Sequence, residues 1–160
     1  MIAVVGHANL TPDTLELVET ALRERVQSLS KGATGLVRTG AGLPVVFGRV
    51  LRDVGRRLVL LLPAQDSVPA LVPPGDQVAT GELLTLAEQV QLLPYDPLNR
   101  NACVSADEHL ISTCGRLLAV WDGSPSDGRD ATAHLVAYAR TRGIPVEVVW
   151  PPGAAREEAA

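Results

Sequence analysis

The sequence of 160 residues is poor in aromatic side chains and almost devoid of lysine. Two Trp, two Tyr and one Phe are its only aromatic residues, although 46% of the residues are hydrophobic. A core must therefore be built mainly from Val, Leu, Ile and Ala, and a chain of this length can form one. Lys31 is the only lysine, so the positive charge is carried by arginine, which suits bidentate phosphate contacts.

Several functional classes lack their sequence signatures. No stretch reaches 18 consecutive apolar residues, and no basic region precedes the first apolar run, so we expect neither a membrane span nor a signal peptide. The formal net charge of −4 argues against nucleic acid as a partner. His109 and His134 lack metal-ligand spacing, and no complete Walker A loop is present. We therefore expect a cytoplasmic domain without membrane, metal or nucleic-acid partners.

Apolar runs alternate with helical patterns along the chain. Buried strands are predicted at 2–5, 35–38, 58–62, 90–93, 117–121 and 146–149, and helices at 12–28, 44–54, 81–88, 101–114 and 130–142. This alternation predicts an α/β, Rossmann-like, doubly wound fold, with a mostly parallel sheet of about six strands and helices on both faces. Residues 1–150 are expected to form one domain, and residues 151–160 a disordered tail.

The usual order of such sheets places the first strand between the second and the fourth, and ligands bind beyond the carboxyl ends of the strands. This geometry selects GHAN, TGAG, PYDPLNR and DGSPSDGRDAT, the segments that follow the first, second, fourth and fifth strands. The candidate ligand-binding residues in or beside them are Gly6, His7, Asn9, Thr39, Gly40, Ala41, Gly42, Tyr95, Arg100, Trp121, Asp122, Gly123, Gly128, Arg129, Asp130, Ala131 and Thr132.

The last of these segments carries the strongest expectation. Residues 128–132 lead into a helix, whose free N–H groups and positive dipole end would receive a phosphate. The carboxylates of Asp127 and Asp130 oppose this reading, since they repel anions and one of them can cap the helix. Each segment also has a purely structural alternative, in which Asn9 braces its loop, His7 is exposed and Asn99 caps a helix.

The segments VVGHANLTPDT, RTGAG and ADEHLISTCGRLLAVWDGSPSDGRDATAHLVAYARTRGIPVEVVW together resemble the SLOG superfamily. That group includes LOG-like, YpsA-like and DprA-like proteins and is related to nucleoside 2-deoxyribosyltransferases. The resemblance implies a Rossmann-like domain that binds a nucleotide between two Gly-rich loops, often as a homodimer. TGAG takes the place of the first loop, and residues 128–132 that of the second.

One departure from this resemblance bears on catalysis. The related enzymes carry a glutamate three residues after a threonine that corresponds to Thr132, and Leu135 stands there. We therefore expect a nucleotide-binding or sensing domain without catalytic activity, whose ligand is AMP-like, ADP-ribose-like or NAD-like. One alternative is an N-glycosidic-bond enzyme, either a phosphoribohydrolase or deoxyribosyltransferase-like, that uses Glu108, Asp122 or Asp96 as its acid. The other is an interaction protein that has lost its ligand.

Overall fold

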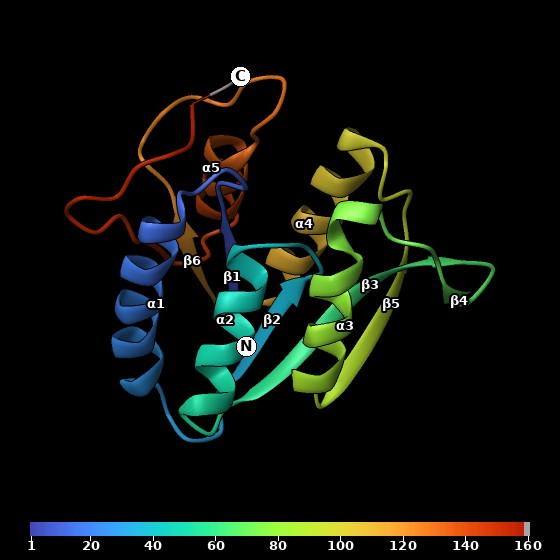
Figure 1. Ribbon diagram of the computed structural model, residues 1–160, viewed down its shortest axis with the longest axis horizontal. Helices are drawn as coiled ribbons and strands as arrows, with labels where there is room; N and C mark the ends of the chain where they lie inside the picture. The colour runs from blue at the N-terminus through green and yellow to red at the C-terminus, as the bar shows by residue number, and fades with distance from the viewer. Residues whose placement is uncertain (159–160) are drawn as a thin grey trace.

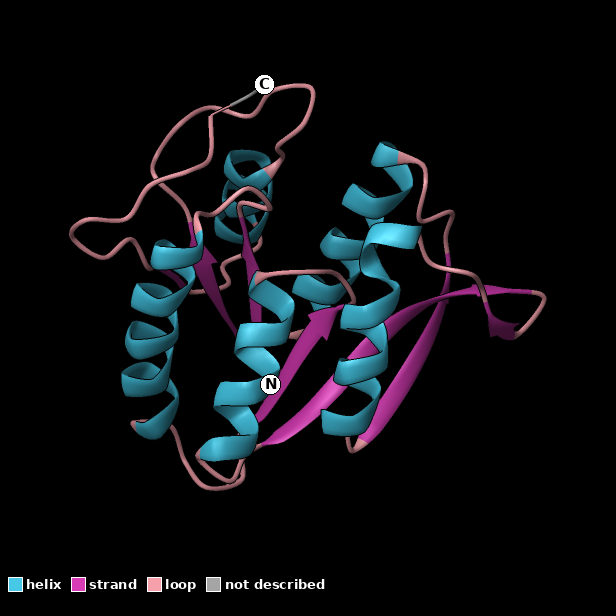
Figure 2. Ribbon diagram, viewed as in Figure 1, coloured by secondary structure: helices cyan, strands magenta, loops and turns pink. Residues whose placement is uncertain are grey.

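The computed structural model describes residues 1–158 and shows a sheet between two layers of helices (Figures 1 and 2). The strands are β1 (Ile2–Gly6), β2 (Thr34–Arg38), β3 (Arg57–Gln65), β4 (Val68–Pro69), β5 (Gln89–Pro94), β6 (Arg116–Val120) and β7 (Val146–Val148). The helices are α1 (Pro12–Gln27), α2 (Leu43–Asp53), the 3-10 turn η1 (Pro74–Asp76), α3 (Gln77–Leu86), α4 (Arg100–Thr113) and α5 (Thr132–Thr141). The predicted α/β, Rossmann-like fold is confirmed.

The order of the sheet differs from the prediction at one strand. β1 lies between β2 and β6, β3 follows β2, and β7 follows β6, all in parallel pairs. β5, which we expected beside the first strand, instead pairs with β3. Its Val90 and Leu92 are exposed, which suits an edge strand and not the doubly covered centre of a parallel sheet. The direction of winding therefore changes between β1 and β6.

Each face of the sheet has its own aliphatic core. The core under α1, α2 and α3 includes Leu22, Phe47 and Leu83, and the core under α4 and α5 includes Ile111 and Val136. Strand residues alternate between the two faces because successive side chains of a strand point in opposite directions. The single Phe of the chain is fully buried, so nearly all of the remaining packing is aliphatic, as expected.

The segment after β7 corrects the expected disordered tail. The hydroxyl of Thr14 and the amide of Thr11 both donate to the carbonyl of Ala155. The amide of Glu157 donates to the carbonyl of Asn9 over 2.7 Å. Residues 151–158 therefore follow a defined path beside the start of α1 (Figure 1). Residues 159–160 lie outside the described part of the chain. Within residues 1–158, none of the helices has the length and apolar character that crossing a membrane requires.

The close approach of α2 to β2 gives a test of this packing. A Cβ atom added at Gly35 would lie 2.3 Å from Leu51 Cδ1 and 3.0 Å from the Phe47 ring. We expect Gly35→Ala to lower the free energy of unfolding by about 1–3 kcal/mol, because overpacking forces side chains and backbone to shift. Urea denaturation measures the change. Gly32→Ala is the control, since its added methyl group meets no atom within 4 Å among the described residues; equal destabilisation of both variants would contradict this packing.

Candidate functional site

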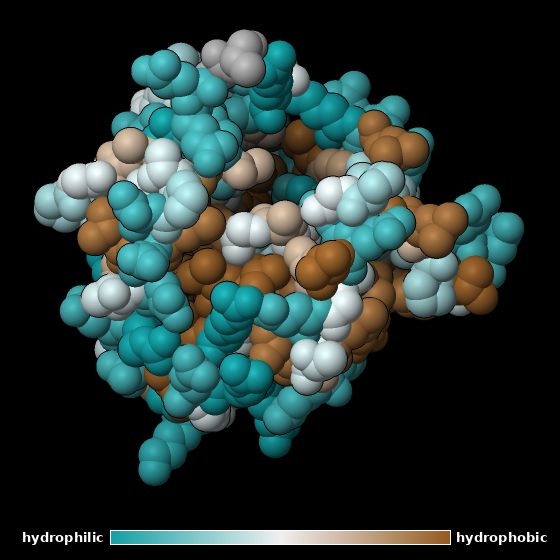
Figure 3. Space-filling view, in the orientation of Figure 1, coloured by the Kyte–Doolittle hydropathy of each residue, from teal (hydrophilic) through white to brown (hydrophobic). Residues whose placement is uncertain are grey.

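A cavity of about 330 Å³ lies at the carboxyl ends of β1 and β2, beside the first turn of α2. Its lining residues are Val4, Val5, Gly6, His7, Ala8, Val37, Arg38, Thr39, Gly40, Ala41, Leu43, Pro44, Asp76, Asp107 and Leu135. Figure 3 shows the surface hollowed above the N-terminal end of α2. A smaller cavity of about 150 Å³ shares five of these lining residues and extends toward the start of α5. We call the two cavities together the crevice.

The TGAG turn brings backbone N–H groups to the crevice. Thr39 anchors this turn, because its buried hydroxyl pairs with that of Thr80 at 2.6 Å and its amide donates to the Leu61 carbonyl. Gly42 has a φ of 78°, a left-handed conformation that glycine adopts without strain, and it directly precedes α2. The amide of Ala41 donates to Asp76 Oδ1 over 3.2 Å, so one position of the turn is already occupied.

Four other amides at this helix start remain unpaired. Among residues 1–158, no protein acceptor is found for the N–H groups of Gly40, Gly42, Leu43 and Val45, and no side chain caps α2. The first N–H groups of a helix have no partner within the helix, and they lie at the positive end of its dipole. The turn therefore presents hydrogen-bond donors to the crevice without a full positive charge.

Arg38 and Asp107 form the charged part of the crevice wall. Arg38 Nε and Nη2 donate to the two carboxylate oxygens of Asp107 over 2.8 and 3.2 Å, which joins the end of β2 to α4. Burial acts to lower the pKa of Arg38, but the charge and hydrogen bonds of Asp107 outweigh it and raise this pKa. The pair was not predicted, although the position of Arg38 directly before TGAG was a usable signal.

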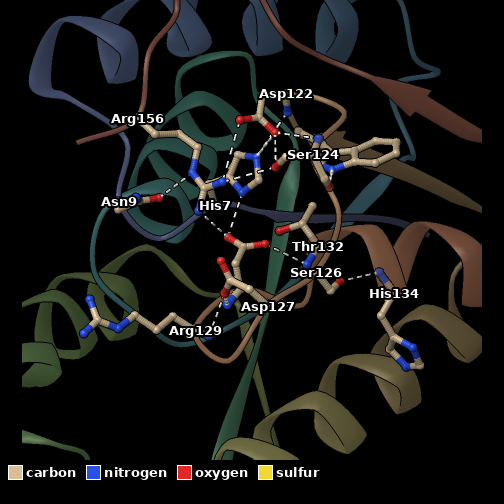
Figure 4. Close-up of polar contacts among 12 residues, drawn as sticks. His7, Asn9, Asp122, Ser124, Ser126, Asp127, Arg129, Thr132, His134 and Arg156 are labelled. Atoms are coloured by element: carbon tan, nitrogen blue, oxygen red, sulfur yellow. Dashed lines mark hydrogen bonds and ion pairs between the residues drawn. The ribbon is translucent and has the colours of Figure 1, made fainter. Parts of the chain in front are cut away.

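His7 lies at the centre of a polar cluster at the ends of β1 and β6 (Figure 4). Its ring is buried, with Nδ1 at 2.7 Å from Asp130 Oδ2 and Nε2 at 3.0 Å from Asp122 Oδ1. The Trp150 ring meets it edge-on, with ring centroids 5.8 Å apart. The buried ring contradicts the exposed position expected of His7, and both ring nitrogens are engaged within the protein, while the residue also lines the main cavity.

Both ring nitrogens of His7 have polar partners. Nδ1 faces the Asp130 carboxylate, and Nε2 faces both the carboxylate of Asp122 and its amide nitrogen, which lies 3.1 Å away. Burial acts to raise the pKa of Asp122, but hydrogen bonds from Ser124 and His7 outweigh it and lower this pKa to about 2. Burial also acts to raise the pKa of Asp130, but hydrogen bonds from His7 and from the amide and hydroxyl of Thr132 outweigh it and lower this pKa.

Arg156 completes the cluster from the C-terminal segment. Its guanidinium nitrogens lie 3.6 Å from Asp122 Oδ2 and 3.4 Å from Asp130 Oδ2, and its Nε donates to Asn9 Oδ1 over 2.9 Å. The amide of Asn9 in turn donates to the Glu157 carbonyl. Asn9 thus braces this segment, which is the structural alternative, and Arg156 was missed because the tail was expected to be disordered.

The turn at residues 128–132 is not the open anion cradle that we predicted. Asp127 Oδ1 accepts the amides of Arg129 and Asp130 over 2.7 and 2.8 Å, and Asp130 Oδ1 accepts the amide of Thr132 over 2.9 Å. Further along α5, the amide of His134 donates to Ser126 Oγ. The carboxylates of the chain itself thus occupy three of the five amides at 128–132, whereas no acceptor is found among residues 1–158 for those of Gly128 and Ala131.

The remaining candidates lie apart from the main cavity. Tyr95 and Asp96 line a separate cavity of about 610 Å³ near β5, and burial raises the pKa of Tyr95 to about 12. Glu108 pairs with His134 at 3.3 Å, and the Trp121 indole donates to the Ser124 carbonyl. Two candidates have other local roles: Arg100 lines the smaller cavity and donates to the Asp127 carbonyl, and Gly123 turns the chain with a φ of 88°. As the structural alternative proposed, Asn99 caps α4.

The two cysteines are free thiols. Cys103 is half-buried on α4, and Cys114 is buried directly after that helix. Burial raises the pKa of both thiols, so neither thiol is activated as a nucleophile.

Fold and site together define a Rossmann-like domain with a crevice at the carboxyl edge of its sheet. The structure is similar to that of DNA processing protein A from Helicobacter pylori, a protein that binds single-stranded DNA, with a TM-score of 0.61 and 13% identity. The match covers 97% of this chain and 67% of that chain. It agrees with the resemblance to DprA-like proteins, and at this identity it shows the fold alone.

A second match is to an uncharacterized protein from Agrobacterium tumefaciens C58, and it covers 92% of this chain and 62% of that chain. Its TM-score is 0.25 at 16% identity, so it carries no argument. Comparison with protein families and with curated proteins finds no match.

This comparison overturns the expectation that nucleic acid is excluded as a partner. A protein with the same fold binds single-stranded DNA, so the fold does not support that exclusion. The expectation rested on the net charge of the whole chain, which does not describe one edge of the sheet. Arg38, Arg100 and Arg129 all line the smaller cavity of the crevice, despite the negative net charge.

The lowered pKa of Asp122 predicts how stability depends on pH. A carboxyl group with a folded-state pKa below its unfolded value, about 3.9, stabilises the fold above that value. This contribution is lost as the pH falls through the folded pKa, here about 2. We expect the free energy of unfolding, from urea denaturation, to decrease between about pH 4 and pH 2, and to decrease less in Asp122→Asn.

The control for this test is Glu16→Gln, an exposed position on α1, which should leave the slope of stability against pH unchanged. A variant at Asp122 with the same slope as the unmodified protein would show that the cluster does not stabilise the ionised carboxylate.

Proposed function

We propose that the chain binds a phosphorylated nucleoside in the crevice, with a phosphate at the N-terminus of α2. The observation that carries this proposal is the set of unpaired amides at Gly40, Gly42, Leu43 and Val45 beside a cavity of about 330 Å³. Cavities of this size are typical of small-ligand sites, and backbone N–H groups at a helix start bind phosphate without a cationic side chain. The carboxyl edge of a doubly wound sheet is also where such folds bind ligands.

The walls of the main cavity suit the rest of a nucleotide. Val4, Val37, Leu43 and Leu135 offer apolar surface to a sugar or a base, and Arg38 is already neutralised by Asp107. An AMP-like ligand suits the main cavity by itself. An ADP-ribose-like or NAD-like ligand would extend into the smaller cavity, where Arg100 and Arg129 are available to a second anionic group.

The same walls favour binding over cleavage of an N-glycosidic bond. Leu135 lines both cavities at the position where the resemblance places a catalytic glutamate. Asp122 is held by His7 and Ser124, and Glu108 faces His134. Such a cleavage needs a carboxylate near the anomeric carbon. Because Asp107 and Asp76 already accept hydrogen bonds from Arg38 and Ala41, they do not replace it readily.

Single-stranded DNA is a second candidate ligand, favoured by the likeness to DNA processing protein A across nearly the whole chain. Arg100 and Arg129, which line the smaller cavity and have no ion-pair partner among residues 1–158, give this edge local positive charge. A strand would place one of its own phosphates at the same α2 amides. The two candidates differ in their response to salt, because a bound strand releases counterions and its affinity falls steeply as the salt concentration rises.

A matched pair of substitutions at Gly40 tests the phosphate position. A Cβ atom at Gly40 meets only Pro44 Cγ, at 3.6 Å, so a side chain is tolerated there. We expect Gly40→Asp to weaken binding of AMP, ADP-ribose or NAD by about tenfold or more relative to Gly40→Asn, because both side chains can accept from the free amides but only the carboxylate repels an anion. Isothermal titration calorimetry measures the affinities.

A single-stranded oligonucleotide, titrated at two salt concentrations, forms the second arm of this experiment. Tight, salt-dependent binding of the oligonucleotide, with none of the mononucleotides bound, would replace the first candidate by the second. If no ligand bound at millimolar concentration, or if both Gly40 variants bound equally well, the α2 start would not be a phosphate site.

A further inference from the structure

The C-terminal segment crosses the edge of the sheet where the winding direction changes. Residues 151–158, which we call the strap, pass over the loops that follow β1 and β6. None of their side chains is buried, whereas Val149, two residues before them, is 1% exposed. The strap therefore contributes little to either hydrophobic core, and the hydrophobic effect does not hold it in place.

Polar contacts hold the strap instead, and the side chain of Arg156 supplies all those that reach the β6 loop and Asp130. Arg156 binds Asn9 in the loop after β1, and Asp122 and Ser124 in the loop after β6. It also binds Asp130 before α5. The backbone adds only a few bonds to Thr11, Thr14 and Asn9. Removing one guanidinium would therefore remove the contacts between the strap and the β6 loop.

The strap also places acidic side chains beside the turn before α5. Glu157 and Glu158 line a cavity of about 320 Å³ together with Asn9, Asp127 and Arg129. Two strap carboxylates thus stand at the side of the crevice where Arg129 is exposed. With the strap closed, this side of the crevice is acidic.

We propose that the strap is a releasable cover of the β1–β6 edge, fastened by Arg156, and that its opening frees the carboxylates of Asp122 and Asp130 toward solvent while the fold stays intact. The rest of the cluster is built to survive the opening. His7 still binds both carboxylates, Asp130 still accepts the Thr132 amide, and Trp150 still contacts His7 from the fixed side of the strap.

Hydrogen–deuterium exchange of the full chain tests this cover without any ligand. The amides of Thr11, Ala155 and Glu157 report on the closed strap, because each donates across the contact between the strap and the β1–α1 region. In Arg156→Gln we expect these amides to exchange about tenfold or more faster, since charged hydrogen bonds are lost. The amides of Thr39 and Val46, which donate to Leu61 and Gly42, should keep their rates.

Glu158→Gln is the matched control, because no hydrogen bond or ion pair is found for this side chain within the described residues, and its exchange should follow the unmodified protein. Asn9→Ala, which removes a second anchor of the strap, should reproduce the local acceleration if Arg156→Gln fails to fold. Uniform acceleration that includes Thr39 and Val46, or no acceleration at Thr11, Ala155 and Glu157, would overturn the proposal.

Discussion

One carboxylate, that of Asp130, sets the arrangement at the carboxyl edge of the sheet. Its Oδ1 accepts the Thr132 amide at the start of α5, and its Oδ2 binds both His7 and Arg156. A single side chain thus connects α5, the end of β1 and the C-terminal segment. Because a carboxylate occupies this helix start, the positive end of α5 is neutralised from within the protein. At the start of α2 the carboxylate of Asp76 accepts only the Ala41 amide, and the amides of Gly42, Leu43 and Val45 find no acceptor within residues 1–158.

The charged groups of the cluster around His7 depend on one another. Charged groups withdrawn from water require partners, and removing one partner leaves the other uncompensated. Here two carboxylates share one histidine ring and one guanidinium, and Ser124 supplies further hydrogen bonds to Asp122. The low pKa values of Asp122 and Asp130 follow from these contacts, despite the opposing effect of burial. These residues thus organise the fold at the place where the sequence suggested a ligand.

Local patterns in the sequence predicted the structural features that depend on residues close together in the chain. The apolar runs marked the parallel strands, and Thr11 and Asn99 cap α1 and α4 as their positions suggest. The position of β5 could not be predicted in this way, because pairing with β3 or with β1 depends on the tertiary fold. The alternating exposure of QVQLLP was the one local sign of an edge strand.

The site was predicted less well than the fold, for a physical reason. The turn at 128–132 has the glycine and helix start of an anion cradle, and the sequence also contains the two aspartates that fill it. Only coordinates decide whether such a side chain points at the amides or away from them. Arg156 lies 26 residues from Asp130 and 147 from Asn9, in a segment whose composition indicates disorder. Contacts of that sequence separation leave no local pattern.

The charge distribution of the crevice constrains what kind of ligand it selects. The donors at α2 are backbone amides, and the arginine nearest to them, Arg38, is neutralised by Asp107. A site of this kind recognises a phosphate by the geometry of its oxygens and gains little from long-range attraction. A nucleic-acid strand, in contrast, depends on unpaired positive charge, which this edge offers at Arg129 beside the strap carboxylates. The fold, which is shared with a DNA-binding protein at 13% identity, permits either ligand, and the distribution of charge at the two helix starts favours the small one on the α2 side.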